Sequence, residues 1–124
     1  MFATAATLAA AASLLATVPV KVTVSGPGHT PKVNTRWNYV VRVTRGGRPV
    51  AGRLTEQIVD PIGGKHPVEF GKSTKKIVDW PIKGVFRDFL LFPPESRGIP
   101  LTFRVTVVVR GSRHVVNYRI TPRG

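Results

Sequence analysis

Cysteine and the acidic residues are the two classes that this chain lacks or has in small number. No cysteine occurs among its 124 residues, which excludes a disulfide framework, a cysteine-ligated zinc site and a thiol nucleophile. Six Asp and Glu residues stand against 19 Lys and Arg residues, so the formal net charge is +13. A charge of that sign on a chain long enough for one domain predicts attraction to polyanions.

Charge is also missing from the N-terminal segment. Residues 1–20, MFATAATLAAAASLLATVPV, contain no charged side chain, and a membrane-spanning helix needs roughly 20 apolar residues. We predict that residues 1–19 form an apolar helical segment that acts as a secretion signal or as a membrane anchor if it is not cleaved. The expected location is then extracytoplasmic, either secreted or anchored to the cell membrane. The alternative is an Ala-rich helix packed on the domain, but apolar residues would occupy every face of such a helix.

No motif for catalysis or metal binding stands out. The three histidines, His29, His66 and His114, lie in or beside predicted turns and lack the spacing of a metal-binding pair. The acidic residues are scattered one to a segment, no serine lies in a GxSxG sequence, and GKST at 71–74 lacks the preceding glycine of a phosphate-binding loop. We therefore predict a non-enzymatic protein with no catalytic residue, no cofactor and no metal.

From residue 20 onward the apolar residues alternate with polar ones, which is typical of strands with one buried face. The segment WNYVVRVT at 37–44 and the segment LTFRVTVVV at 101–109 show this most clearly. Arg110 and Gly111 separate the last two apolar runs and predict a hairpin. The seven predicted strands cover residues 20–25, 37–44, 51–59, 68–70, 85–92, 101–109 and 112–121.

This pattern predicts an all-β fold, an antiparallel β-sandwich of about seven strands formed by residues 20–124. A five-stranded barrel of the oligonucleotide-binding type is the structural alternative. The phenylalanines at 86, 89, 92 and 103 are expected in the core, while TRGGRPVAG at 44–52 is expected to connect two strands, with Gly46 and Gly47 at positive φ.

The stretches WNYVVRVT, GGRPVAG and GIPLTFRVTVVV together resemble the bacterial immunoglobulin-like domains of envelope and secreted proteins, in particular exported immunoglobulin-like proteins of actinobacteria. The resemblance covers about residues 20–121 and implies an immunoglobulin-like sandwich with a binding or structural role at the cell envelope. The Cys, Trp, Cys pattern of antibody-type domains is not present.

Basic residues form the candidate binding surface. If the last two strands are neighbours, the outward residues Arg104, Arg110, Arg113 and Arg119 share a face. A second basic group in mid-chain comprises Lys65, Lys72, Lys75, Lys76 and Lys83, of which Lys72, Lys75 and Lys76 are the candidate site residues. The predicted partners are an anionic envelope polymer, lipid headgroups or another envelope protein. The alternative function is nucleic-acid binding, although Phe103 and Arg104 point to opposite sides of one strand, which disfavours a stacking platform. Solubilising edge charge without a partner is the third interpretation.

Overall fold

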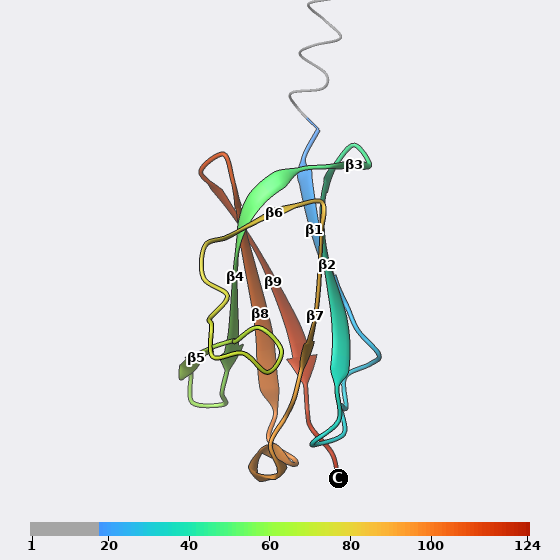
Figure 1. Cartoon of the computed structure of the whole chain (residues 1–124), viewed down its shortest axis with the longest axis vertical. Helices are drawn as coiled ribbons and strands as arrows, with labels where there is room; N and C mark the ends of the chain where they lie inside the picture. Colours follow the sequence, from blue (N-terminus) through green and yellow to red (C-terminus); the bar gives the residue numbers. More distant parts are fainter. Residues whose placement is uncertain (1–17) are drawn as a thin grey trace, which may run out of the picture.

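The computed structural model describes residues 18–124, which form nine β-strands and one short 3-10 turn (Figure 1). Residues 1–17 of the predicted apolar helical segment lie outside the described residues. In the range 18–124, no helix has the length and apolar content that a membrane crossing requires. The elements are β1 (Val20–Ser25), β2 (Trp37–Arg45), β3 (Arg48–Pro49), β4 (Ala51–Val59), β5 (Lys65–Pro67), β6 (Trp80–Lys83), β7 (Val85–Leu90), η1 (Pro94–Ser96), β8 (Leu101–Val109) and β9 (Ser112–Ile120).

The strands form two antiparallel sheets that face each other, so the chain has the layered form of a β-sandwich (Figure 1). One layer has the order β1-β2-β7 and the other the order β6-β4-β8-β9. They are joined at one corner, where β6 pairs with β4 over four residue pairs and with β7 through Lys83 and Val85 alone. The short strands β3 and β5 pair with β2 and β4 respectively.

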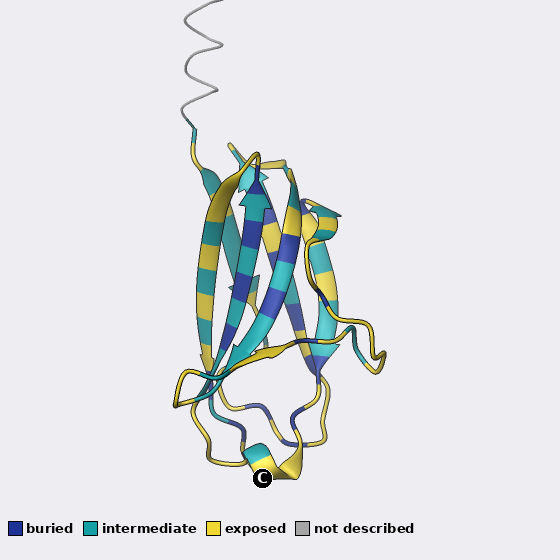
Figure 2. Cartoon of the chain, turned by 90° about the vertical axis from the view of Figure 1, so that its left-hand side faces the viewer, coloured by how far each residue is buried: buried dark blue, intermediate teal, exposed yellow. Residues whose placement is uncertain are grey.

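Alternate side chains along the strands are buried, and these side chains fill the space between the two layers (Figure 2). Val41 and Val43 of β2 and the three inward residues Phe103, Val105 and Val107 of β8 are completely buried. Their neighbours along each strand point outward and are partly or fully exposed. Burial of each such side chain contributes about 1.5–3 kcal/mol relative to exposure, so the core fixes which face of each strand points to solvent.

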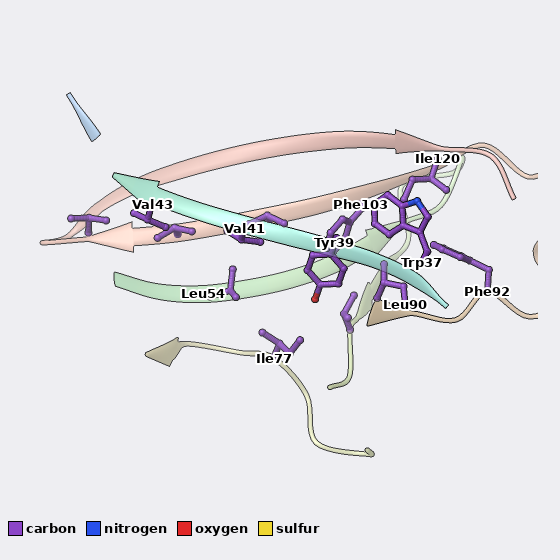
Figure 3. Close-up of a cluster of buried hydrophobic side chains, with 14 residues drawn as sticks. Trp37, Tyr39, Val41, Val43, Leu54, Ile77, Leu90, Phe92, Phe103 and Ile120 are labelled. Carbon is purple, nitrogen blue, oxygen red and sulfur yellow. The ribbon is translucent and has the colours of Figure 1, made fainter. Parts of the chain in front are cut away.

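Trp37 organises the aromatic end of the core, where it lies beside Tyr39 and Phe92 (Figure 3). Its ring contacts Phe103 edge to face at a centroid distance of 6.1 Å and Tyr118 at 5.5 Å. The indole nitrogen donates a hydrogen bond to the carbonyl oxygen of Gly28 at 3.1 Å. Trp37 therefore ties both sheets to the loop before β2.

The predicted all-β antiparallel fold is confirmed, and six of the seven predicted strands lie where the alternation placed them. The hairpin at Arg110 and Gly111 is confirmed, with positive φ at both residues, and so is positive φ at Gly46 and Gly47 in the turn between β2 and β3. The two-layer arrangement is not that of a five-stranded barrel.

Two parts of the strand prediction are wrong. The short strand after β4 is Lys65–Pro67 rather than residues 68–70, because β4 turns back through a tight loop in which Asp60 accepts backbone hydrogen bonds from Ile62 and Gly64. The alternation also did not identify β6, a four-residue strand with a proline at its second position.

Gly84 occupies the corner where the two sheets join, and its substitution tests that corner. Its amide donates to the Val50 carbonyl oxygen at 3.0 Å and its carbonyl accepts from the Val43 amide at 2.8 Å. Its φ is +78°, and an added Cβ would lie 2.6 Å from the Pro49 Cβ. We expect Gly84→Ala to lower the free energy of unfolding by about 3 kcal/mol, from backbone strain plus overpacking, in urea denaturation.

Gly98→Ala is the matched control for that experiment. Gly98 has nearly the same φ, +77°, but an added Cβ would meet no atom within 4 Å. We expect this variant to lose only about 1 kcal/mol from backbone strain. Equal losses in the two variants would show that the corner does not constrain the sandwich.

Candidate anion-binding surface

The outer surface of β4, β8 and β9 gathers four arginines, and we call it the arginine face. Antiparallel pairing of β8 with β9 sets Arg104 opposite Asn117, Arg119 opposite Thr102 and Arg113 opposite Val108. On the other side of β8, Arg53 of β4 also lies opposite Val108. All four side chains point away from the core, because their strand neighbours Leu54, Phe103, Val105, Val107 and Ile120 are buried.

The arginine face is elongated along the strands. Arg113 and Arg119 are six residues apart on β9, which corresponds to about 20 Å at the rise of an antiparallel strand. Arg53 and Arg113 flank one end of the face, and Arg104 and Arg119 are diagonal neighbours toward the other end. The rows between them hold uncharged residues such as Thr55 and Thr106. This spacing suits an extended anion better than a single small one.

Hydrogen bonds hold two of these guanidinium groups in place. The Arg104 Nε donates to the Asn117 Oδ1 at 2.9 Å, across the strand pair. The Arg53 Nη1 donates to the Asp79 carbonyl oxygen at 3.0 Å. Both partners are neutral groups, so the positive charge of each arginine is positioned without being neutralised.

Carboxylates do not neutralise the basic side chains elsewhere either. Residues 18–124 include every charged side chain of the sequence, and within them the one ion pair joins His66 to Asp60 at 2.9 Å. No Lys or Arg in this range lies within 4.0 Å of an Asp or Glu carboxylate oxygen. Their charge is therefore available to anions outside the chain.

The other predicted basic residues lie apart from this strand surface. Arg110 lies in the turn between β8 and β9. Lys72, Lys75 and Lys76 belong to the loop between β5 and β6, where the Lys75 ammonium lies 4.6 Å from the centre of the Trp80 ring. That loop bonds to β4 through the Ile77 carbonyl and to β7 through the Gly71 amide, which donates to Asp88. The structure thus does not merge the lysine group with the arginine face.

Sequence reasoning missed Arg53 and the basic residues on the opposite layer. Alternation within residues 51–59 was the signal that would have placed Arg53 outward. Lys21, Arg42 and Arg87 lie on the outer surface of β1, β2 and β7, because each alternates with inward residues of its strand. The positive charge therefore covers both outer surfaces of the sandwich.

The expectation that Phe89 belongs to the core is wrong. Asp88, not Phe89, shares the inward face of β7 with Phe86 and Leu90, since Asp88 is paired with the buried Tyr39 of β2. Phe89 lies on the outer side and is covered by the Arg36 guanidinium, whose carbon is 4.3 Å from the ring centre. A carboxylate thus occupies an inward position that the aromatic pattern did not predict.

The three histidines have separate surroundings. His29 stacks on Tyr118 at a centroid distance of 4.3 Å, and its Nδ1 lies 2.6 Å from the Arg119 carbonyl oxygen. His66 bonds to Asp60, and His114 is half-buried on the inward side of β9 rather than free in a loop. In the described part of the chain, no group of three or more His, Asp or Glu residues could hold a metal ion.

A polar pair lies inside the sandwich. The Tyr39 hydroxyl of β2 donates a short hydrogen bond to the Glu56 Oε1 of β4, and Glu56 is completely buried. Its second oxygen, Oε2, has no hydrogen-bond partner among the described residues. The pair joins the two sheets through a polar contact in an apolar core.

Burial controls the ionisation of this pair. The pKa of Glu56 is raised to about 8, chiefly by desolvation and also by the charge of Asp88, while the hydrogen bond from Tyr39 opposes the rise. Burial, then the nearby Glu56, raises the pKa of Tyr39 as well. At neutral pH Glu56 therefore holds a proton, which adds one positive charge to the formal count.

A scan against protein-family models and a search of curated proteins both found no match to the chain. The surface residues and their geometry are therefore the basis for any functional proposal.

Glu56 makes the stability of the domain depend on pH. Its pKa is about 8 in the folded chain against 4.5 ordinarily, so between these values the folded state holds a proton that the unfolded state has lost. The free energy of unfolding should fall as pH rises through this window, by up to about 1.4 kcal/mol per pH unit. Urea denaturation at pH 5, 6.5 and 8 measures this slope.

Glu56→Gln should flatten that slope, because glutamine is neutral throughout the window. Glu69→Gln, which removes an exposed carboxylate, should leave it unchanged. A slope that persists in Glu56→Gln would show that another group takes up the proton.

Proposed function

We propose that the chain is a non-enzymatic, exported or membrane-tethered immunoglobulin-like domain that binds an extended anionic polymer of the cell envelope through the arginine face. The observation that carries this proposal is the set of four outward arginines on β4, β8 and β9, none of them paired with a carboxylate in residues 18–124. A structural role at the envelope follows if the bound polymer is part of the wall.

The strand order supports the immunoglobulin-like assignment. In immunoglobulin domains, strands A, B and E lie in one sheet and strands C, F and G in the other. The order β1-β2-β7 in one sheet is compatible with strands A, B and E, and the order β4-β8-β9 in the other is compatible with strands C, F and G. The short strand β6 lies at the edge between them, where strands vary within this group of folds.

Charge and spacing support a polyanion as the partner. An anion that follows β9 meets Arg113 and Arg119 about 20 Å apart, with Arg104 beside the second of them. Each contact releases counterions from the polymer, so affinity should fall steeply with salt. Anionic lipid headgroups could engage the same side chains, but a bilayer presents a plane and would recruit the other outer surface equally well.

Matched charge removal tests this role of the arginine face. We expect the triple variant Arg104→Gln, Arg113→Gln, Arg119→Gln to bind purified anionic wall polymer at least about 10-fold more weakly than the wild type at 0.1 M salt. The negative slope of log K against log salt should become shallower by about 2, if each lost contact contributes as a phosphate contact does on nucleic acid. Fluorescence titration over a salt series measures both quantities.

The control variant Lys21→Gln, Arg42→Gln, Arg87→Gln removes the same number of charges from the opposite outer surface. We expect it to lose less than about 3-fold in affinity, since exposed charges act weakly beyond the Debye length. Equal losses in both triple variants would assign the binding to the overall charge. Tighter binding of single-stranded DNA than of the wall polymer, lost in the first variant only, would favour the nucleic-acid alternative.

Export is tested with the N-terminal segment. We expect residues 1–25, fused to a reporter that is active only outside the cytoplasm, to give a signal that a fusion lacking residues 1–19 does not give, because we propose that this apolar segment acts as the secretion signal. A cytoplasmic full-length chain would contradict the envelope role without affecting the arginine face.

A further inference from the structure

A groove of about 520 Å³ lies where the two sheets are not joined. β6 pairs with β4 only over residues 51–54, and β7 meets β6 only at Val85. Beyond that corner β4 and β7 are not paired, and the lining residues of the groove come largely from the loop after β5 and from the segment between β7 and β8.

The floor and walls of this groove are apolar. They include Ile58 of β4, Leu101 of β8 and Leu90 of β7. Two further apolar side chains, Leu91 and Ile99, stay 41% and 38% exposed at its mouth. A volume of this size and an apolar lining are typical of sites for small organic molecules.

The charged residues that line the groove are mainly acidic, whereas the protein as a whole is basic. Glu69 from the loop after β5 and Glu95 from η1 bring carboxylates to its two sides. His66 is its one basic lining residue, and Asp60 pairs with it. None of the described residues that line the groove is Lys or Arg, although the chain has 19 of them.

From this combination we infer that the groove binds an amphiphilic organic cation, a molecule with an aliphatic or aromatic body and one ammonium group. The apolar body would replace water along Ile58, Leu90 and Leu101, and the ammonium group would lie at the mouth between the carboxylates of Glu69 and Glu95. The rest of the surface repels cations, so these two carboxylates select the orientation and the charge of the ligand.

An anionic amphiphile of the same length fits this site less well. Its head group would face Glu69 and Glu95, and the unpaired arginines of the arginine face offer it a better place. The two classes of ligand are therefore expected to bind at different positions on the same molecule. This separation makes the inference independent of the proposed polymer binding.

Three probes with the same ten-carbon chain test the inference on the full chain. They are decyltrimethylammonium, neutral decyl maltoside and anionic decyl sulfate, each used below its micelle concentration. We expect the cation to bind at least about 5-fold more tightly than the neutral probe and to shift the amide NMR signals of residues 66–71 and 89–101. Decyl sulfate should shift signals of β8 and β9 instead.

Removal of the carboxylates isolates their contribution. The variant Glu69→Gln, Glu95→Gln should bind decyltrimethylammonium about 5- to 30-fold more weakly, as expected for two partly exposed ion pairs, and bind decyl maltoside unchanged. Asp79→Asn, which removes a carboxylate outside the groove lining, should bind all three probes as the wild type does.

Removal of apolar surface provides a second readout at exposed positions. Leu91→Ser, Ile99→Ser should weaken both the cationic and the neutral probe, because the body of each would lose the same contacts. The inference is overturned if the cation and the neutral probe bind equally to the wild type, if the carboxylate variant binds the cation as tightly as the wild type, or if the amide shifts lie outside the groove.

Discussion

The apolar interior between β2 and β8 is the constraint on which the other features of this domain depend. Val41, Val43, Phe103, Val105 and Val107 have no exposed surface. Because side chains alternate strictly along a strand, a slip of one residue would exchange this core with the outer residues. The strand register that buries the valines is therefore also the register that places Arg104, Arg113 and Arg119 on one outer surface. The packing of the core and the charge of that surface both follow from the same strand pairing.

Much of this arrangement could be predicted from the sequence, because it depends on local periodicity. The long strands β2, β8 and β9 show alternation over nine residues each, and the turn at Arg110 and Gly111 fixes which strands pair. Alternation fails where a polar residue faces inward. Asp88 faces inward on β7 because its carboxylate accepts the Gly71 amide at 3.1 Å, a contact between residues 17 positions apart, so Phe89 lies outside against the aromatic expectation.

The groove could not be predicted in this way. Its two sides come from segments 66–71 and 89–101, which contain little regular structure and meet only because β6 is too short to close the sheet. Glu69 and Glu95 have no spacing in the sequence that relates them. Likewise, the pairing of Glu56 with Tyr39 depends on the packing of β4 against β2 in different sheets, and the single visible sign was an acidic residue at an inward position between Leu54 and Ile58.

The protonated state of Glu56 also limits how the domain would release the polyanion that we propose as its partner. The isoelectric point expected from the sequence is about 11.6, whereas Glu56 loses its proton near pH 8. As the pH rises, Glu56 therefore becomes charged inside the core and destabilises the fold. This happens well below the pH at which the net charge of the protein reaches zero. Throughout the pH range in which its core is uncharged, the folded domain remains strongly cationic. Ionic strength and competing anions, not alkalinity, would therefore govern dissociation of the proposed polyanion.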